Sequence, residues 1–254
     1  MRTQIRTIIF SKNRAMQLEA LLRSLSLENV FVLYKCDDGF RPGYDKLIKM
    51  FPDVCFIGEI SFKGQVLDLM LGEHILFLVD DDIMIRSFSE DCNEFEEFKG
   101  NEEIITLSLR MATKYDYAFL RDKEVPLPDF NGGKWEWRNH SHDWGYPMAT
   151  AHIFRSKDIL PILNKVEFSC PHTMEHALRR NAPDKKYALC FEEAKFINNL
   201  ANQVQSKYKC KNAKIPVESL EALFVKGERI DIDKLIEKAK ESRSAFMMEE
   251  YTWI

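Results

Sequence analysis

Short apolar runs alternate with segments of helical periodicity through the first hundred residues, and this alternation constrains the fold more than any other feature. The apolar runs are 7–10, 30–34, 54–57 and 75–79, and the helical segments between them are 14–25, 44–50 and 65–71. Strands that return through crossover helices pair in parallel. The pattern therefore predicts an α/β fold with a mostly parallel central sheet flanked by helices.

The rhythm changes beyond residue 100. Strands are expected at 104–109 and 149–154, and helices at 172–180, 192–205, 217–225 and 231–242. Residues 114–147, between the two strands, lack a clear period but are rich in Trp and Tyr, which is typical of a folded wall or lid rather than of disorder. We expect one domain over residues 1–210 and a helical C-terminal extension over residues 211–254.

Composition limits the partners that the chain can bind. Of its 254 residues, 45% are hydrophobic and 30% charged, and the net charge of −4 gives no field that would attract nucleic acid. No apolar run approaches the roughly 20 residues of a membrane span, although peripheral membrane association stays open. The six cysteines form no Cys-x-x-Cys pair and are interpreted as buried reduced thiols. These features predict a cytoplasmic protein with a small-molecule partner.

Three consecutive aspartates, Asp80, Asp81 and Asp82, follow the apolar run 75–79. In open α/β sheets, ligands bind outside the carboxyl ends of the strands, so these side chains are expected in the ligand crevice. Adjacent carboxylates repel one another, and a divalent cation shared with a phosphate would neutralise them. Oxygen ligands suit Mg²⁺ or Mn²⁺. The alternative is a solvated acidic turn in which one aspartate caps a helix.

Two more loops follow predicted strands. Asp37-Asp38-Gly39 comes after the second strand, and its carboxylates can accept hydrogen bonds from a nucleobase or a ribose, although Asp-Gly is also a common turn. Ser11-Lys12-Asn13-Arg14 comes after the first strand and opens a helix. A helix N-terminus and two cations there would suit a diphosphate.

The three loops, in this order, resemble those of GT-A-fold glycosyltransferases of the family 2 type, with a DxD motif at Asp80-Asp81-Asp82. The resemblance extends to the run from Gly145 to Arg155, which is similar to the acceptor side of that fold. It also extends to the helix 172–180, where such enzymes place Glu-Asp and a downstream Arg. It covers residues 5–205.

The resemblance implies a GT-A catalytic domain that acts as a metal-dependent hexosyltransferase. It would move a sugar from a nucleotide diphosphate donor, with a UDP-sugar expected, to a saccharide or other hydroxyl acceptor in surface glycan synthesis. The cofactor would be Mn²⁺ or Mg²⁺. Its expected ligands are Asp82 and Asp80, with His142 as a third.

The resemblance also implies roles for the remaining loop residues. Asp38 would hold the base or the ribose, and Glu175 would take the proton of the acceptor hydroxyl. Because Glu175-His176 stands where the family has Glu-Asp, His176 is the other candidate for the base. The donor site is expected to comprise Ser11, Asn13, Arg14, Asp37, Asp38, Asp80 and Asp81.

Two functional alternatives remain at this point. His172-Thr-Met-Glu175-His176 fits the H-x-x-E-H pattern of zinc hydrolases and peptidases, and the chain could instead be a non-catalytic nucleotide-binding module. Two groups of residues have an ordinary explanation beside a functional one. Trp135, Trp137 and Trp144 would either stack on a sugar or pack internally, and Asn198, Asn199, Asn202 and Gln203 are expected on a solvent-exposed face of helix 192–205.

Overall fold

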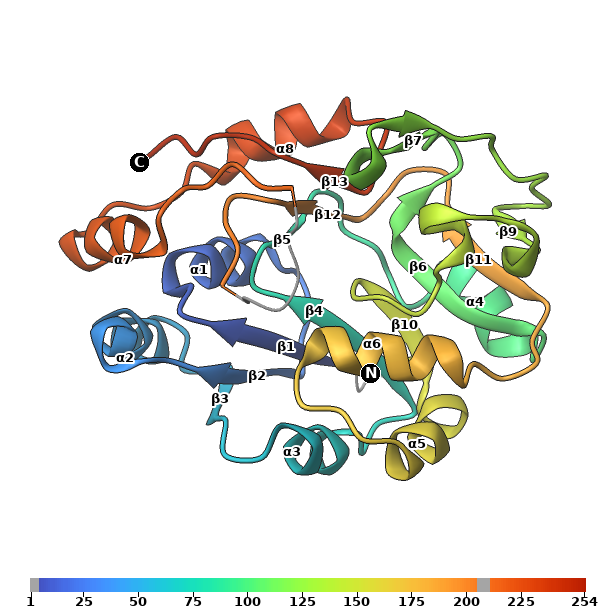
Figure 1. The fold of residues 1–254 in the computed structure, drawn as a ribbon, viewed down its shortest axis with the longest axis horizontal. Helices are drawn as coiled ribbons and strands as arrows, with labels where there is room; N and C mark the ends of the chain where they lie inside the picture. Colours follow the sequence, from blue (N-terminus) through green and yellow to red (C-terminus); the bar gives the residue numbers. More distant parts are fainter. Residues whose placement is uncertain (1–4, 205–210) are drawn as a thin grey trace.

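The computed structural model describes residues 5–204 and 211–254 and has an eight-stranded central sheet of order β3-β2-β1-β4-β10-β6-β11-β9 (Figure 1). Strands β1 to β4 are mutually parallel, whereas β10 is antiparallel to its neighbours β4 and β6. The predicted fold class is confirmed. The strands are β1 (Ile5–Lys12), β2 (Val30–Lys35), β3 (Cys55–Gly58), β4 (His74–Val79), β6 (Ile104–Ala112), β9 (Lys134–Trp135), β10 (His152–Arg155) and β11 (Tyr187–Phe191).

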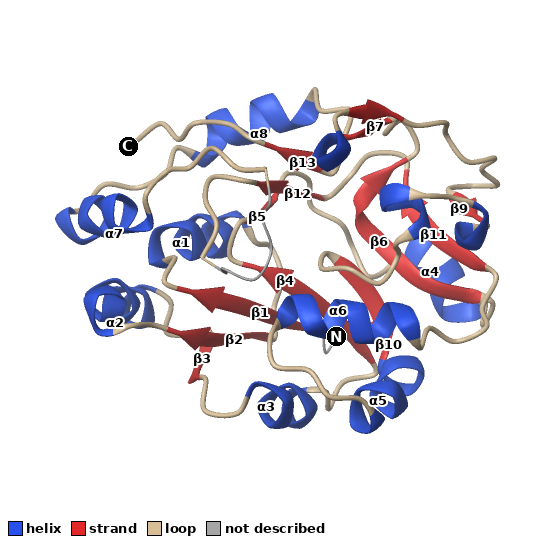
Figure 2. Ribbon diagram, in the orientation of Figure 1, coloured by secondary structure: helices blue, strands red, loops and turns tan. Residues whose placement is uncertain are grey.

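Helices surround this sheet (Figure 2). Helix α1 packs beside α2 and α7, and α4 covers β6 and β11. Among the described residues, no helix has both the length and the apolar character needed to cross a membrane. The helices are α1 (Ala15–Ser24), α2 (Arg41–Met50), α3 (Phe62–Leu69), α4 (Asn93–Gly100), α5 (Ser156–Lys165), α6 (Pro171–Arg180), α7 (Val217–Lys226) and α8 (Ile232–Lys240).

A second, three-stranded sheet joins the residues after the aspartates to the C-terminal part of the chain. It consists of β5 (Asp82–Met84), β12 (Phe196–Asn199) and β13 (Phe246–Met247), in the order β13-β12-β5. The helix expected at 192–205 is therefore wrong where the structure describes it; residue 205 lies outside the described residues. Strand β12 is buried on both faces, and such a short strand shows no alternation that would distinguish it from a helix.

The aromatic segment 114–147 is folded, as expected. It contains β7 (Tyr117–Ala118), β8 (Lys123–Glu124), β9 and short 3₁₀ turns. Trp135, Trp137 and Trp144 are buried, and each indole N–H donates to a backbone carbonyl at 2.9–3.0 Å. Internal packing, and not an exposed stacking surface, accounts for these three residues.

The C-terminal helices are tied to the N-terminal half by buried polar contacts. Glu19 on α1 is fully buried and accepts hydrogen bonds from Arg23 and from Arg229, which follows α7. Glu221 on α7 accepts the backbone N–H of Gly43 at 2.7 Å. An added Cβ at Gly43 would lie 2.4 Å from the Glu221 carboxylate, so this approach requires glycine.

The cysteines differ from the expectation of buried thiols. Among the described cysteines, which are all unpaired, Cys190 is buried, Cys55 is exposed, and Cys36, Cys92 and Cys170 are half-buried. The general tendency of free cysteine to be buried does not hold for Cys55, on the edge strand β3. Cys210 lies outside the described residues.

Candidate active site

The candidate site lies at the edge of the sheet where β4 and β6 end and β10 begins. Because β10 is antiparallel to both neighbours, its first residues lie beside the carboxyl ends of β4 and β6. Asp80, Asp81 and Asp82 follow β4 at this edge, as predicted. They are only 2–8% exposed, so the solvated acidic turn is excluded.

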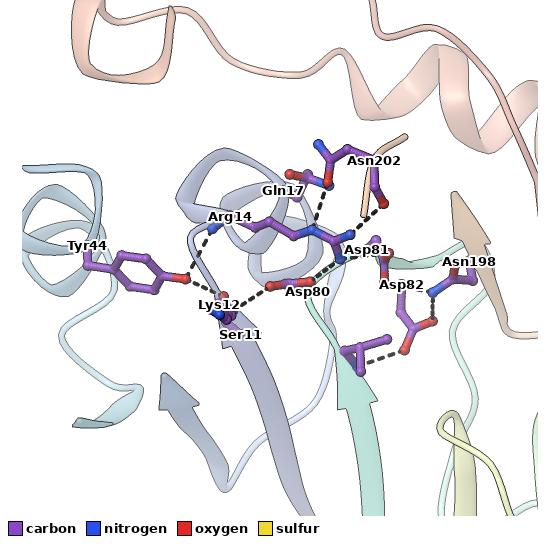
Figure 3. Close-up of polar contacts among 11 residues, drawn as sticks. Ser11, Lys12, Arg14, Gln17, Tyr44, Asp80, Asp81, Asp82, Asn198 and Asn202 are labelled. Atoms are coloured by element: carbon purple, nitrogen blue, oxygen red, sulfur yellow. Dashed lines mark hydrogen bonds and ion pairs between the residues drawn. The ribbon is translucent and has the colours of Figure 1, made fainter. Parts of the chain in front are cut away.

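Arg14 is the counter-ion of the first two aspartates. Its guanidinium donates to Asp80 and to Asp81, at 2.8 Å in each case, and to the side chain and backbone carbonyl of Asn202 (Figure 3). Asp80 also accepts the backbone N–H of Lys12. Burial alone would lower the pKa of Arg14, but Asp81 and Asp80 outweigh it and raise that pKa. Arg14 is therefore engaged by the protein itself, whereas the sequence suggested that it would bind a diphosphate.

Asp82 points away from Arg14 and toward β12 (Figure 3). One carboxylate oxygen accepts the backbone N–H of Val79 at 2.9 Å, and the other accepts the side chain of Asn198 at 2.9 Å. Burial and the neighbouring Asp81 raise the pKa of Asp82 to about 7. Among the described residues, no basic side chain lies within ion-pair distance of this carboxylate.

The environment of Asp82 fits a metal site with one or two carboxylate ligands, and it does not fit a site built from three protein ligands. A buried carboxylate without an ion-pair partner suits a cation that takes one or two carboxylates and completes its shell with phosphate and water. In the described parts of the chain, no three His, Cys, Asp or Glu side chains converge to hold a metal ion. His142, in a 3₁₀ turn with a φ of 56°, does not join Asp80 and Asp82 in such a group.

Glu175 reaches the same edge of the sheet from α6. Its carboxylate accepts the backbone N–H of Thr150, just before β10, at 2.8 Å. Burial raises the pKa of Glu175 to about 7. His172 and His176 lie one turn apart on α6 with their Nε2 atoms 3.0 Å from each other. No third ligand completes a zinc centre with them among residues 5–204 and 211–254.

Arg110 lies near the carboxyl end of β6, a strand that is buried along its whole length. It is 7% exposed, and its guanidinium lies 4.2 Å from the ring centre of Phe246. The positive charge of Arg110 lowers the pKa of both Asp82 and Glu175 against the effect of burial. Arg110 is thus a buried positive charge at the same edge of the sheet as the two carboxyls.

The loop after β2 lies beside the N-terminal loop. Asn13, whose φ is 54°, and Asp37 exchange two hydrogen bonds of 2.7 and 2.9 Å. Ser11 shares a 2.6 Å hydrogen bond with the buried Tyr44. Asp38 is exposed in a short 3₁₀ turn. Asp37 and Asp38 are both exposed, but one oxygen of Asp37 is engaged by Asn13, so Asp38 is the stronger candidate to contact a ligand.

Sequence reasoning missed several residues of this site. Asn198, Asn199 and Asn202 are buried, although solvent exposure was expected, and Asn198 bonds both Asp81 and Asp82. Their contacts depend on β12 being a strand, which the sequence pattern did not show. Arg110 did leave a signal, because a charged residue within an otherwise apolar strand must either pair or serve a ligand.

Comparison with known proteins gives a distant relative. No protein-family model matches the chain. The bifunctional glycosyltransferase pgtA of Dictyostelium discoideum is 29% identical over 199 residues, which are 64% of this chain and 25% of that protein. The chain therefore spans a quarter of the length of this glycosyltransferase relative.

Solved structures show a weaker similarity. TarS residues 1–349 from S. aureus has 14% identity and a TM-score of 0.48, over 76% of this chain and 60% of that one. The same TarS fragment in complex with UDP scores 0.43 at 14% identity, over 73% and 60%. A cytidylyltransferase from Leptospira borgpetersenii scores 0.41 at 14% identity, over 95% and 98%. All of these TM-scores are below 0.5, so no residue role is transferred from these structures.

Proposed function

We propose that this chain is a glycosyltransferase that takes a hexose from a nucleotide diphosphate donor, with UDP-sugars as the first donors to test. The acceptor would be a saccharide or another hydroxyl compound of a surface glycan. The glycosyltransferase relative supports the general activity. One observation carries the proposal: the buried Asp82, after β4, and the half-buried Glu175, on α6 beside the start of β10, both have a raised pKa and reach one edge of the sheet.

The two carboxylates suit different tasks. Glu175 would remove the proton of the acceptor hydroxyl, and a base with a pKa near the working pH is the most effective one. Asp82 would hold Mn²⁺ or Mg²⁺, whereas Asp80, the other ligand expected from the sequence, is engaged by Arg14 and the Lys12 N–H. When bound, that cation would offset the negative charge that develops on the departing diphosphate. Asp38 would contact the base or the ribose, and the Asn13 and Asp37 pair shapes the loop beside it.

Thermal unfolding with a panel of nucleotide sugars tests donor binding. A ligand that binds only the folded state at 100 times its Kd adds about 2.7 kcal/mol, which raises the Tm of a chain of this size by about 5–10 °C. We expect this shift with UDP-sugars in the presence of Mn²⁺ and its loss in Asp82→Ala. The exposed Asp91→Ala is the control. No shift with any nucleotide sugar would contradict the proposal.

Two further measurements separate the alternatives. Transfer or hydrolysis of the sugar by the purified protein distinguishes an enzyme from a nucleotide-binding module. Stoichiometric zinc that is lost in His176→Ala would instead favour the hydrolase, an outcome that the absence of a three-ligand group in the described residues argues against.

A further inference from the structure

Arg110 has an environment that its protein contacts do not explain. A guanidinium carries five N–H donors in a planar fork, yet no hydrogen bond or ion pair joins the Arg110 side chain to any described residue. Its guanidinium packs against the ring of Phe246. Burial of a charge is costly unless the charge is paired, and a cation–π contact replaces only part of the lost hydration.

The position of Arg110 indicates what completes its environment. It lies at the carboxyl end of β6, across the first residues of β10 from Asp82 and Glu175. The charge of Arg110 acts on the pKa of both carboxyls, but neither lies within ion-pair distance. Among the described residues, no carboxylate neutralises the Arg110 guanidinium, so its N–H donors are available to an anionic ligand.

We propose that Arg110 binds the β-phosphate of the nucleotide diphosphate donor. This inference rests on the proposed function. Arg110 and Asp82 lie at the same edge of the sheet, and the guanidinium fork matches two phosphate oxygens of a diphosphate. Transfer breaks the bond between the sugar carbon and the β-phosphate oxygen, and the bonding electrons stay on that oxygen. Arg110 would stabilise the resulting charge, while the acceptor oxygen bonds to the sugar and its proton goes to Glu175.

Calorimetric titration with UDP and with UMP, both in the presence of Mn²⁺, tests the assignment because UMP lacks the β-phosphate. We expect Arg110→Gln to weaken UDP binding by about 10- to 100-fold, as for the loss of charged hydrogen bonds, and UMP binding by less than about 3-fold on the same scale. Arg110→Lys keeps the charge but loses the fork, and should weaken UDP binding to an intermediate extent.

A matched control removes a similar guanidinium elsewhere. Arg138 stacks on Trp137 with the same 4.2 Å separation, and Arg138→Gln should leave both affinities unchanged. Phe246→Leu keeps Arg110 but removes the aromatic ring on which its guanidinium packs. This variant should weaken the binding of UDP more than the binding of UMP. This variant and Arg110→Lys provide the test if Arg110→Gln does not fold.

The outcomes separate this inference from the proposed function. If Arg110→Gln keeps the wild-type affinity for UDP, or loses affinity for UDP and UMP equally, Arg110 does not bind the β-phosphate. An anionic group on the acceptor would then be the alternative ligand. The proposed function would still stand after that result, provided that the wild-type protein transfers the sugar of a UDP-sugar. If the wild-type protein binds neither UDP nor UMP, a UDP-sugar donor and the role of Arg110 both fail.

Discussion

Asp82 and Glu175 change charge near neutral pH, because burial raises the pKa of each carboxyl to about 7. Both keep hydrogen-bond donors on the carboxylate, which favour the charged form and limit the shift. Each of the two acids thus titrates near neutral pH, and a bound cation would favour the charged form of Asp82.

Asp82 predicts a pH dependence of stability. Its pKa in the folded chain is about 7 against an ordinary value of 3.8, so the folded state binds the proton more tightly than the unfolded state. Stability is therefore highest below pH 4 for this group and falls as pH rises toward 7. We expect Asp82→Asn to remove roughly 2–4 kcal/mol of that fall, measured as the Tm of both proteins from pH 5 to 8 without divalent cations.

The exposed Asp91→Asn serves as the control for this measurement and should follow the wild-type curve. Parallel curves for the wild type and Asp82→Asn would contradict the raised pKa. An ordinary ion-paired aspartate behaves differently, because it loses its stabilising effect only below about pH 5 and contributes no slope between pH 5 and 8.

Glu175 predicts the pH dependence of activity. Loss of the general base should lower kcat by about 10²- to 10⁴-fold in Glu175→Gln, while the Kd of UDP changes little because the amide oxygen can still accept the Thr150 N–H. Wild-type kcat should rise with pH through about 7 as the carboxyl loses its proton. Steady-state kinetics with a donor sugar measure both effects.

Glu167→Gln is the matched control for Glu175, since Glu167 is exposed and pairs with Lys63 at the surface. If Glu175→Gln retained wild-type kcat and His176→Gln lost it, the base would be His176.

Strand β12 is the element that holds the aspartates in place. Asn198 donates to Asp81 at 2.8 Å and to Asp82 at 2.9 Å. Asn198→Ala would leave two buried carboxylate oxygens with fewer donors, at a cost of about 1–3 kcal/mol. We expect a lower Tm. Because Asn198 lowers the pKa of Asp82, we also expect the fall in stability caused by ionisation of Asp82 to occur at a higher pH in this variant.

The exposed Asn139, which bonds Glu136, is the control for this element. An Asn198→Ala protein with the Tm of Asn139→Ala would show that β12 does not hold the aspartates. Urea unfolding at two pH values distinguishes the two results.

The same element shows where sequence reasoning fails. Apolar residues at 196, 197, 200, 201 and 204 match a helical period, but the chain forms a strand because β5 and β13 provide partners on both sides. A pairing between residues 82–84, 196–199 and 246–247 cannot be read from any one local window. By contrast, β4 and its terminal aspartates were predictable, since a continuous apolar run followed by charges is a local signal.

At the scale of the whole molecule, Glu19 links the C-terminal helices to the rest of the fold. It is fully buried between Arg23 and Arg229. Glu19→Gln leaves Arg23 and Arg229 without their anionic partner. We therefore expect the free energy of unfolding, measured by chemical denaturation, to fall by about 3–5 kcal/mol. Glu167→Gln, at a surface pair, should cost less than about 1 kcal/mol. Equal effects would contradict the structural role of Glu19.

Long-range contacts explain what the sequence could and could not predict of the molecule. The order of the first strands follows from crossover connections, which are regular. Two contacts of the site join residues more than a hundred positions apart, namely the hydrogen bond from Arg14 to Asn202 and the packing of Arg110 on Phe246. Such contacts depend on how whole elements pack, so the candidate residues near β4 and α6 were found while their counter-ions and supports were not.

The joining of β5, β12 and β13 has a consequence for synthesis on the ribosome. The acidic turn emerges well before Asn198, Asn202 and the strand at Phe246–Met247. Non-local pairing cannot begin before its last partner is available. A nascent chain therefore carries its acids without these partners until residue 247 has emerged, and the second sheet is complete only from that point on.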